Sequence, residues 1–119
     1  MKGMIDEKGR ALLPVTMIQT GGSRLAITAW VDTAFDGELL IPRHQLEQMG
    51  YSQFGTGRAI LADGSEAEIA GTIGYVDWFG AHRPVQIIAS NGTLPLLGVA
   101  LLDGHRLCID YDDRSVTLD

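Results

Sequence analysis

The chain has 119 residues, a length that suits one domain with a substantial core and leaves little room for a second. Apolar residues make up 45% of the sequence and charged residues 20%, which argues against an intrinsically disordered chain. The formal net charge of −6 would repel phosphate, so nucleic acid is a poor partner. We therefore expect a single globular domain over residues 1–119.

Most of the chain consists of short β-branched or alternating runs separated by glycine turns, a pattern typical of an all-β domain. The expected strands cover residues 11–19, 24–31, 38–41, 58–62, 66–78, 84–89, 106–111 and 115–118. Gly21 and Gly22 can take the positive φ of a tight reversal and predict a first hairpin. Asp63 and Gly64 predict a second hairpin over residues 58–70, whose many polar residues indicate that it projects into solvent as a possible cover.

Two short helices are expected within this β-rich pattern. Pro42 fits the first position of one helix, Leu46 and Met49 share a face, and Gly50 can end it. The second helix is predicted to begin near Pro95 and to continue to residues 103–104. It is apolar nearly all round, so we expect it to be buried.

Several classes of function lack support in the sequence. The longest apolar runs are too short to cross a bilayer and the first residues carry no apolar signal segment, so we expect a cytoplasmic protein. Cys108 is the only cysteine and is predicted to be a small buried side chain between Leu107 and Ile109. The three histidines have no ligand-spaced partners, so no metal site and no cofactor are predicted.

The informative segment covers residues 29–42, where one apolar strand delivers Asp32 into a turn and a second apolar strand leaves it. A carboxylate beside apolar strands is costly unless it is hydrogen-bonded or functional, and such acids concentrate at active sites. The alternative is that Asp32 and Thr33 only cap the turn by bonding nearby backbone N–H groups.

The order of three elements decides between these interpretations. Residues 31–40 (VDTAFDGELL) resemble the Asp-Thr-Gly motif and following apolar strand of the retropepsin-like, or clan AA, aspartic peptidases, especially small prokaryotic members. Residues 96–102 (LLGVALL) are similar to the family's apolar pair and glycine that enter a helix, and residues 61–65 lie where the tip of the family's flap hairpin belongs. The resemblance implies a closed β-barrel or sandwich with a flap and one or two short helices.

The resemblance also implies roles for individual residues. Asp32 matches the catalytic acid, and Thr33 matches the residue whose hydroxyl braces the opposite loop across a dimer axis. Asp36 matches a position that contacts the substrate backbone, and Phe35 is interpreted as apolar packing or a subsite wall. Gly98 would let the helix approach the catalytic loop closely.

The hairpin tip supplies the remaining expected contacts with substrate. Ala62, Asp63 and Gly64 are assigned to substrate binding through the resemblance. An extended peptide could pair its backbone with this hairpin even if the protein did not cut it.

A peptidase of this kind needs two carboxyl groups that share a proton, whereas the chain holds one copy of the motif. Asp77 and Asp110 lie in strand patterns without a following Thr-Gly-type turn and are interpreted as outward-facing strand acids. A two-fold axis that places Asp32 against its own copy solves the problem, so we expect a homodimer acting on polypeptide. The tail over residues 106–118 is a candidate for part of that interface.

Ala34 stands where the family has glycine. If the position requires positive φ, alanine costs about 1 to 2 kcal/mol; if it requires closeness, the methyl group crowds its neighbours. Three explanations remain open: a tolerated variant of an active enzyme, an inactive relative, or an introduced substitution. The sequence thus predicts an aspartic endopeptidase, with a peptide-binding or scaffold dimer as the alternative.

Overall fold

The computed structural model describes residues 1–52, 54–61 and 63–119. Its centre is a closed ring of strands, because each strand pairs with the next and β6 pairs back with β2. In order around the ring, the strands are β2 (Ala11–Ile18), β3 (Arg24–Val31), β8 (Leu96–Leu97), β4 (Leu39–Pro42), β7 (Ala81–Ser90) and β6 (Glu66–Trp78). The predicted all-β class with a closed barrel is confirmed.

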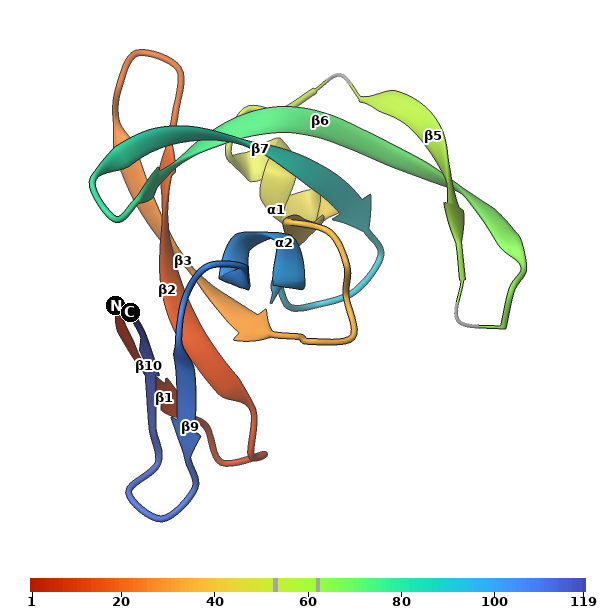
Figure 1. Ribbon diagram of the computed structural model, residues 1–119. Coiled ribbons are helices and arrows are strands. Elements are labelled where there is room, and N and C mark those ends of the chain that lie inside the picture. The colour runs from red at the N-terminus through yellow and green to blue at the C-terminus, as the bar shows by residue number, and fades with distance from the viewer. Residues whose placement is uncertain (53, 62) are drawn as a thin grey trace.

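Two extensions leave this ring. Beyond β2, the sheet continues through β1 (Lys2–Ile5), β10 (Ser115–Leu118) and β9 (Leu107–Asp110), while β5 (Gly55–Ile60) pairs with the first half of β6. The N- and C-terminal ends of the chain lie side by side (Figure 1), and the Met1 ammonium donates to the carbonyl oxygen of Leu118 at 2.9 Å. The sequence analysis did not predict β1, and it began β5 three residues late.

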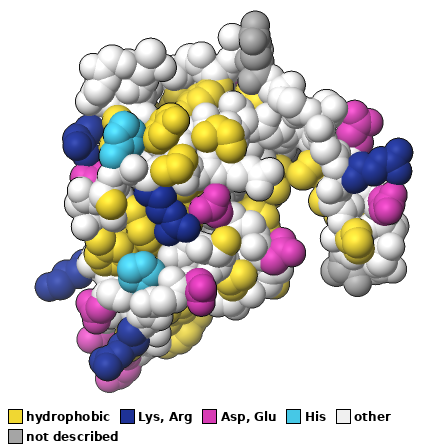
Figure 2. All heavy atoms as spheres, turned by 45° about the horizontal axis from the view of Figure 1, so that its top comes forward, with side chains coloured by type: hydrophobic (Ala, Val, Ile, Leu, Met, Phe, Trp, Pro, Cys, Tyr) yellow, Lys and Arg dark blue, Asp and Glu magenta, His cyan; other side chains and the backbone are white. Residues whose placement is uncertain are grey.

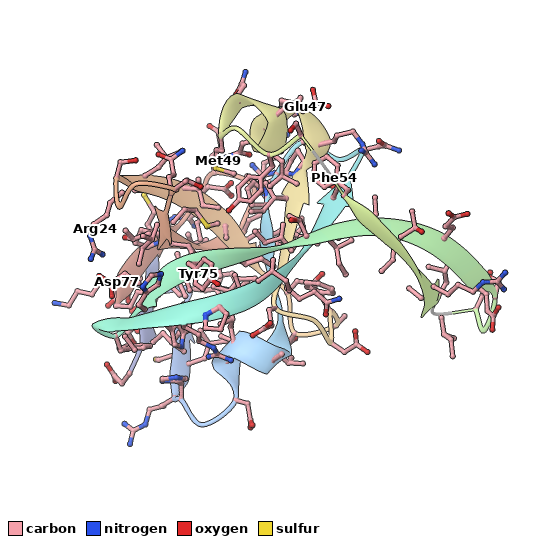
Figure 3. The ribbon with its side chains drawn as sticks, turned by 90° about the horizontal axis from the view of Figure 1, so that it is seen from above. Arg24, Glu47, Met49, Phe54, Tyr75 and Asp77 are labelled. Atoms are coloured by element: carbon pink, nitrogen blue, oxygen red, sulfur yellow. The ribbon has the colours of Figure 1, made fainter. Side chains whose placement is uncertain are left out.

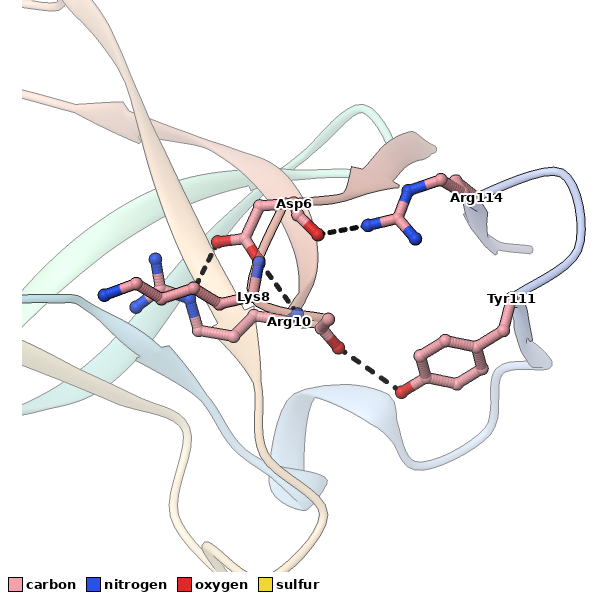
Figure 4. Close-up of polar contacts among 6 residues, drawn as sticks. Asp6, Lys8, Arg10, Tyr111 and Arg114 are labelled. Atoms are coloured by element: carbon pink, nitrogen blue, oxygen red, sulfur yellow. Dashed lines mark hydrogen bonds and ion pairs between the residues drawn. The ribbon is translucent and has the colours of Figure 1, made fainter.

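Polar contacts join the β1–β2 turn to the β9–β10 turn (Figure 4). The Asp6 carboxylate accepts from Arg10 Nε at 2.7 Å and from the Arg10 backbone N–H at 2.9 Å. Arg114 reaches across from the other turn and donates to the Asp6 carbonyl oxygen, and the Tyr111 hydroxyl donates to the carbonyl oxygen of Gly9 at 3.5 Å. These contacts hold the outer end of the extension together.

The core is entirely apolar among the described residues. Along β2, every second residue is buried, as expected of a strand with one face toward a core. The largest fully buried side chains are those of Leu13, Met17, Leu39, Ile41, Leu46, Ile87, Leu97, Leu101, Leu118, Val15, Val76 and Val85. They come from β2, β4, β6, β7, β8 and β10 and from both helices. Strand β3 adds the buried Ile27, Ala29 and Val31, so one core supports the whole barrel.

The two helices are α1 (Arg43–Gln48) and α2 (Val99–Leu102). For α1, the predicted end is confirmed, since Gly50 takes a φ of +93° directly after the C-cap, but Pro42 lies one residue before the helix rather than in its first position. The second helix is much shorter than predicted. Leu96 and Leu97 form strand β8, which pairs with β3 and β4, and the helix begins only at Val99.

The β5–β6 hairpin projects from the barrel as predicted (Figure 1). In the space-filling view it stands as an arm beside an open gap, with acidic and basic side chains along it (Figure 2). Ile60 and Leu61 near its tip are 77% and 48% exposed, and Gly64 takes a φ of +86° in the predicted turn. Ala62 lies outside the described residues.

Two strand acids have structural partners. Asp77 forms an ion pair with Arg24 at 2.7 Å (Figure 3) and accepts the N–H of Gly80 at 2.9 Å. Asp110 accepts the N–H groups of Asp112 and Asp113 in the β9–β10 turn. Both carboxylates therefore stabilise turns.

The interpretation of Cys108 as buried is wrong. Its neighbours Leu107 and Ile109 pack against the core, whereas Cys108 is exposed because successive side chains of a strand point to opposite faces. None of the described helices is long and apolar enough to span a membrane.

Candidate active site

Asp32 lies directly after β3, at the end of an apolar strand, and is half-buried. Its backbone N–H donates to the carbonyl oxygen of Leu97 at 2.9 Å, which continues the β3–β8 pairing by one step. Its side-chain Oδ1 accepts the N–H of Ala34 at 2.9 Å. Within the described part of the chain, Oδ2 has no hydrogen-bond partner, so the loop orients the carboxylate through one oxygen and leaves the other without a bond.

The loop after Asp32 is fixed by backbone hydrogen bonds from the segment that leads into α2. The N–H groups of Gly98, Val99 and Ala100 donate in turn to the carbonyl oxygens of residues 38, 35 and 37, at 2.9, 2.9 and 3.2 Å. Before the loop, the N–H of Trp30 in β3 donates to the carbonyl oxygen of Pro95 at 2.8 Å. Each such hydrogen bond contributes about 1 kcal/mol to the folding free energy, and together they fix the conformation of the loop.

Gly98 allows these two segments to approach. A Cβ atom there would lie 2.1 Å from the carbonyl oxygen of Gly37 and 2.6 Å from the ring of Phe35. The Phe35 ring also covers Gly37, where a Cβ atom would lie 2.5 Å from the ring. Phe35 is half-buried against the backbone of two glycines, which is a packing role.

Thr33, Ala34 and Asp36 are exposed on the outer side of the loop. Among the described residues other than glycine, only Phe79 and Arg114 have positive φ, so the backbone of Ala34 is not in the left-handed region. The strain that the sequence analysis considered for alanine at this position is therefore absent. What remains is the effect of a methyl group on whatever packs against the loop.

Beside Thr33 the surface is hollowed. An open hollow of about 580 Å³ is lined by Thr33, by Val99 and Leu102 from α2, and by Leu107 from the start of β9. Asp103 and His105 add polar side chains to this otherwise largely apolar lining, which lies next to the Asp32 loop.

The tip residues Asp63 and Gly64 lie in the turn between β5 and β6, on the hairpin that projects from the barrel (Figure 1). The Ser65 hydroxyl donates to Asp63 Oδ1 at 2.6 Å and its N–H donates to the same oxygen at 2.9 Å. These two hydrogen bonds, the hydroxyl first, hold the pKa of the Asp63 carboxyl below its usual value. The hairpin tip is thus an ordered turn with a charged carboxylate at neutral pH.

In comparisons with known proteins, no family model and no curated protein matches the chain. Solved structures do match. A retropepsin-like aspartic protease from Rickettsia conorii superimposes with a TM-score of 0.73 at 15% identity, covering 99% of this chain and 88% of that one. The chain has a retropepsin-like fold.

Two further retropepsin-like structures agree. EIAV protease in complex with the inhibitor HBY-793 gives a TM-score of 0.61 at 17% identity, over 82% of this chain and 88% of that chain. The retroviral protease-like domain of Ddi1 from Leishmania major gives 0.57 at 20% identity, over 92% and 88%. At these identities the likeness establishes the fold, and the fold implied by residues 31–40 and 96–102 is confirmed.

The sequence analysis gave no role to a charged pair at the exit of the retropepsin-like loop. Arg83 of β7 donates to the Glu38 carboxylate at 3.1 Å, across 45 positions of the chain. In the sequence, Glu38 is distinguished only as a charged residue directly before the apolar residues of β4. No sequence pattern identified its partner.

Proposed function

We propose that the chain, acting as one domain over residues 1–119, is an aspartic endopeptidase that works as a homodimer. The observation that supports this most directly is the half-buried carboxylate of Asp32, with one oxygen tied to the Ala34 N–H and the other free, on a pinned loop of a retropepsin-like barrel. A turn cap alone would explain the bond to Ala34. It would not explain why the segment before α2 also holds the loop, at an approach so close that position 98 must be glycine.

Peptide hydrolysis by this mechanism requires two carboxyl groups that contact the same water molecule. One carboxylate acts as general base on the water, while a protonated carboxyl donates to the oxygen of the scissile carbonyl. Two such groups a few ångströms apart share one proton, because both cannot ionise easily. This reaction uses only side chains and water, without a metal or cofactor.

The second carboxyl group is proposed to be Asp32 of a second copy. Two other strand aspartates are occupied elsewhere: Asp77 by Arg24, and Asp110 by the turn that follows it. A two-fold axis beside the loop would bring the exposed Thr33 and the hollow next to it against the partner. In that arrangement the Thr33 hydroxyl braces the opposite loop, and the start of β9 contributes to the interface.

The substrate is proposed to lie between the loop and the β5–β6 hairpin. Asp36 is exposed on the loop and available to the substrate backbone. The hairpin would act as a flap that closes over an extended peptide, with Asp63 and Gly64 at its tip. The substrate-binding role of Ala62 is proposed from the sequence alone, since this residue lies outside the described residues. We propose that the enzyme acts on unfolded polypeptide, in the cytoplasm.

The decisive experiment compares the wild type with Asp32→Asn. We expect the purified wild type to cleave unfolded polypeptide at acidic pH, to be inhibited by a statine-type transition-state mimic, and to sediment as a dimer. Asp32→Asn should remove cleavage and retain the fold. Glu47→Gln makes the same change from carboxylate to amide on the exposed face of α1, away from the proposed interface, and should keep activity. Cleavage that survives in Asp32→Asn would disprove the mechanism.

One observation favours a second candidate function. Ala34 places a methyl group at an exposed position of the loop where the family has glycine, and such a group could block close approach of the partner loop or substrate. The protein would then be a peptide-binding or scaffold dimer. Peptide binding without cleavage by both the wild type and Ala34→Gly would favour this function over the peptidase.

A further inference from the structure

We propose that Arg83, acting through Glu38, is a positioning residue that fixes the exit of the Asp32 loop and so holds the catalytic carboxylate in place. The proposal deepens the proposed peptidase function and rests on it. Its basis is a set of contacts that join the loop, β7 and α2 through one half-buried ion pair.

Glu38 contacts three separate groups at the point where the loop becomes β4. Its Oε1 accepts the backbone N–H of Gln86 at 2.8 Å, and its Oε2 accepts from Arg83 Nη2 at 3.1 Å. Its carbonyl oxygen accepts the N–H of Gly98 at 2.9 Å. One residue therefore joins the loop to β7 through its side chain and to the segment before α2 through its backbone.

The bond to Gln86 continues a strand pairing beyond its end. The parallel pairing of β4 with β7 begins at Leu39 and Ile87, so the backbone one residue earlier has already turned away toward the loop. The Glu38 carboxylate takes the N–H of Gln86 in place of a backbone carbonyl. This contact fixes where the loop ends, because it sets the first residue that belongs to the barrel.

Arg83 connects Glu38 to helix α2. The same Nη2 that donates to Glu38 also lies 3.5 Å from the carbonyl oxygen of Ala100, in α2. Ala100 in turn donates its N–H to the carbonyl oxygen of Gly37. The guanidinium thus neutralises Glu38 and contacts the helix that itself holds the loop.

This pair is more buried than the Arg24–Asp77 and Arg58–Glu66 pairs, and among the described residues the Arg10–Asp6 pair of the β1–β2 turn, at 30% and 17%, is less exposed still. The Arg83 and Glu38 side chains are 34% and 22% exposed, against 56% and 33% for Arg24 and Asp77. Exposed pairs contribute little because water screens them, whereas removal of one partner from a partly buried pair leaves a poorly solvated charge. Without Arg83, the Glu38 carboxylate is expected to turn toward water and release Gln86.

Loss of the hydrogen bond between Glu38 and Gln86 would displace the loop without removing any group that touches substrate. Misplacement of a reacting group by about 1 Å can cost a factor of about 100 in rate. We therefore expect Arg83→Gln to lower kcat by about tenfold or more and to change KM by less than about threefold. Arg83→Lys keeps a cation near Glu38 and should recover part of the lost kcat.

The experiment measures kcat, KM and amide hydrogen exchange in the full chain for the wild type, Arg83→Gln, Arg83→Lys and Glu38→Gln. The control is Arg24→Gln, which breaks the Arg24–Asp77 pair away from the loop. We expect Arg83→Gln to accelerate exchange at the Gln86 and Gly98 amides by about tenfold, since a charged hydrogen bond is lost. Arg24→Gln should change neither exchange nor kcat.

Exchange and activity separate the two proposals. Unchanged exchange at Gln86 and Gly98 in Arg83→Gln, or accelerated exchange with unchanged kcat, would overturn the positioning role. A wild type without activity would overturn the proposed function alone, and the exchange rates would still decide whether Arg83 holds the loop. If Arg83→Gln fails to fold, Glu38→Gln gives a second test, because it replaces the charged acceptor of the Gln86 N–H by a neutral one and should accelerate exchange there by a smaller factor. Unchanged exchange at Gln86 in this variant would overturn the positioning role.

Discussion

A Cβ atom on Gly98 would lie 2.1 Å from the carbonyl oxygen of Gly37, a separation that no side-chain carbon can adopt. The obstacle is backbone, so no rotation of a side chain can relieve it. The loop that carries Asp32 and the segment that enters α2 are therefore too close there for any residue with a Cβ atom at position 98. This contact, with the hydrogen bonds beside it, sets the position of the loop relative to the barrel.

Gly98→Ala should consequently damage both stability and activity. The loop or the helix must move to admit the methyl group, and overpacking of this kind typically costs about 1–3 kcal/mol of unfolding free energy. We expect that loss in chemical denaturation, together with loss of cleavage. Gly92→Ala is the matched control, because its new Cβ would meet only Ser90 Oγ, at an ordinary 3.5 Å. Equal destabilisation by the two variants would contradict this explanation.

Phe35 tests whether the ring packs the loop or lines a subsite. Because the ring covers Gly37 and Gly98, Phe35→Ala should lower the free energy of unfolding by about 1–2 kcal/mol, less than for a fully buried phenylalanine. Phe35→Leu, which keeps an apolar side chain, should recover most of the loss in the same denaturation experiment. A change in KM without any loss of stability in Phe35→Ala would instead assign the ring to a substrate subsite.

The variant Ala34→Gly distinguishes backbone strain at this position from crowding by the Ala34 methyl group. Since Ala34 is not at positive φ, glycine relieves no backbone strain, and the added freedom of the unfolded chain should lower stability by about 0.5–1 kcal/mol. If the methyl group crowds the partner loop or the substrate, cleavage by Ala34→Gly should nevertheless be at least as fast as in the wild type. A gain in stability would show that Ala34 is strained after all.

The predictions that succeeded rest on local physics. The glycine turns at residues 21–22 and at Gly64 were predicted from conformational freedom, and each takes positive φ. Strands β2, β3 and β6 were predicted from short β-branched or alternating runs in the sequence. The barrel was predicted because residues 31–40 and 96–102 resemble family motifs, and the fold comparison confirmed it.

The errors arise where distant segments decide the structure. Leu96 and Leu97 belong to an apolar run that suits either a helix or a strand, and their pairing with β3 and β4 makes them a strand. Strand β1 has no alternating pattern and forms because β2 and β10 flank it. The contact of Glu38 with Arg83 spans 45 positions, so nothing near either residue indicates it.

Asp6 gives a prediction about stability in acid. The hydrogen bond from the backbone N–H of Arg10, supported by the Arg10 side chain and by the N–H of Lys8, holds the pKa of the Asp6 carboxyl below its usual value of 3.8. The folded state therefore binds the proton less readily than the unfolded chain does. The resulting stabilisation is complete above the unfolded pKa and disappears as the pH falls through the folded one.

Asp6→Asn should accordingly be less stable than the wild type at neutral pH, and the difference should shrink below about pH 4. Thermal or urea unfolding followed from pH 7 to pH 2 measures this convergence. Glu7→Gln removes an acidic charge from the same turn, where the Glu7 carboxylate has no hydrogen bond among the described residues, and should stay within about 0.5 kcal/mol of the wild type. A constant difference between Asp6→Asn and the wild type down to pH 2 would mean that the charge of Asp6 contributes nothing. The loss at neutral pH would then reflect only the changed shape of the acceptor.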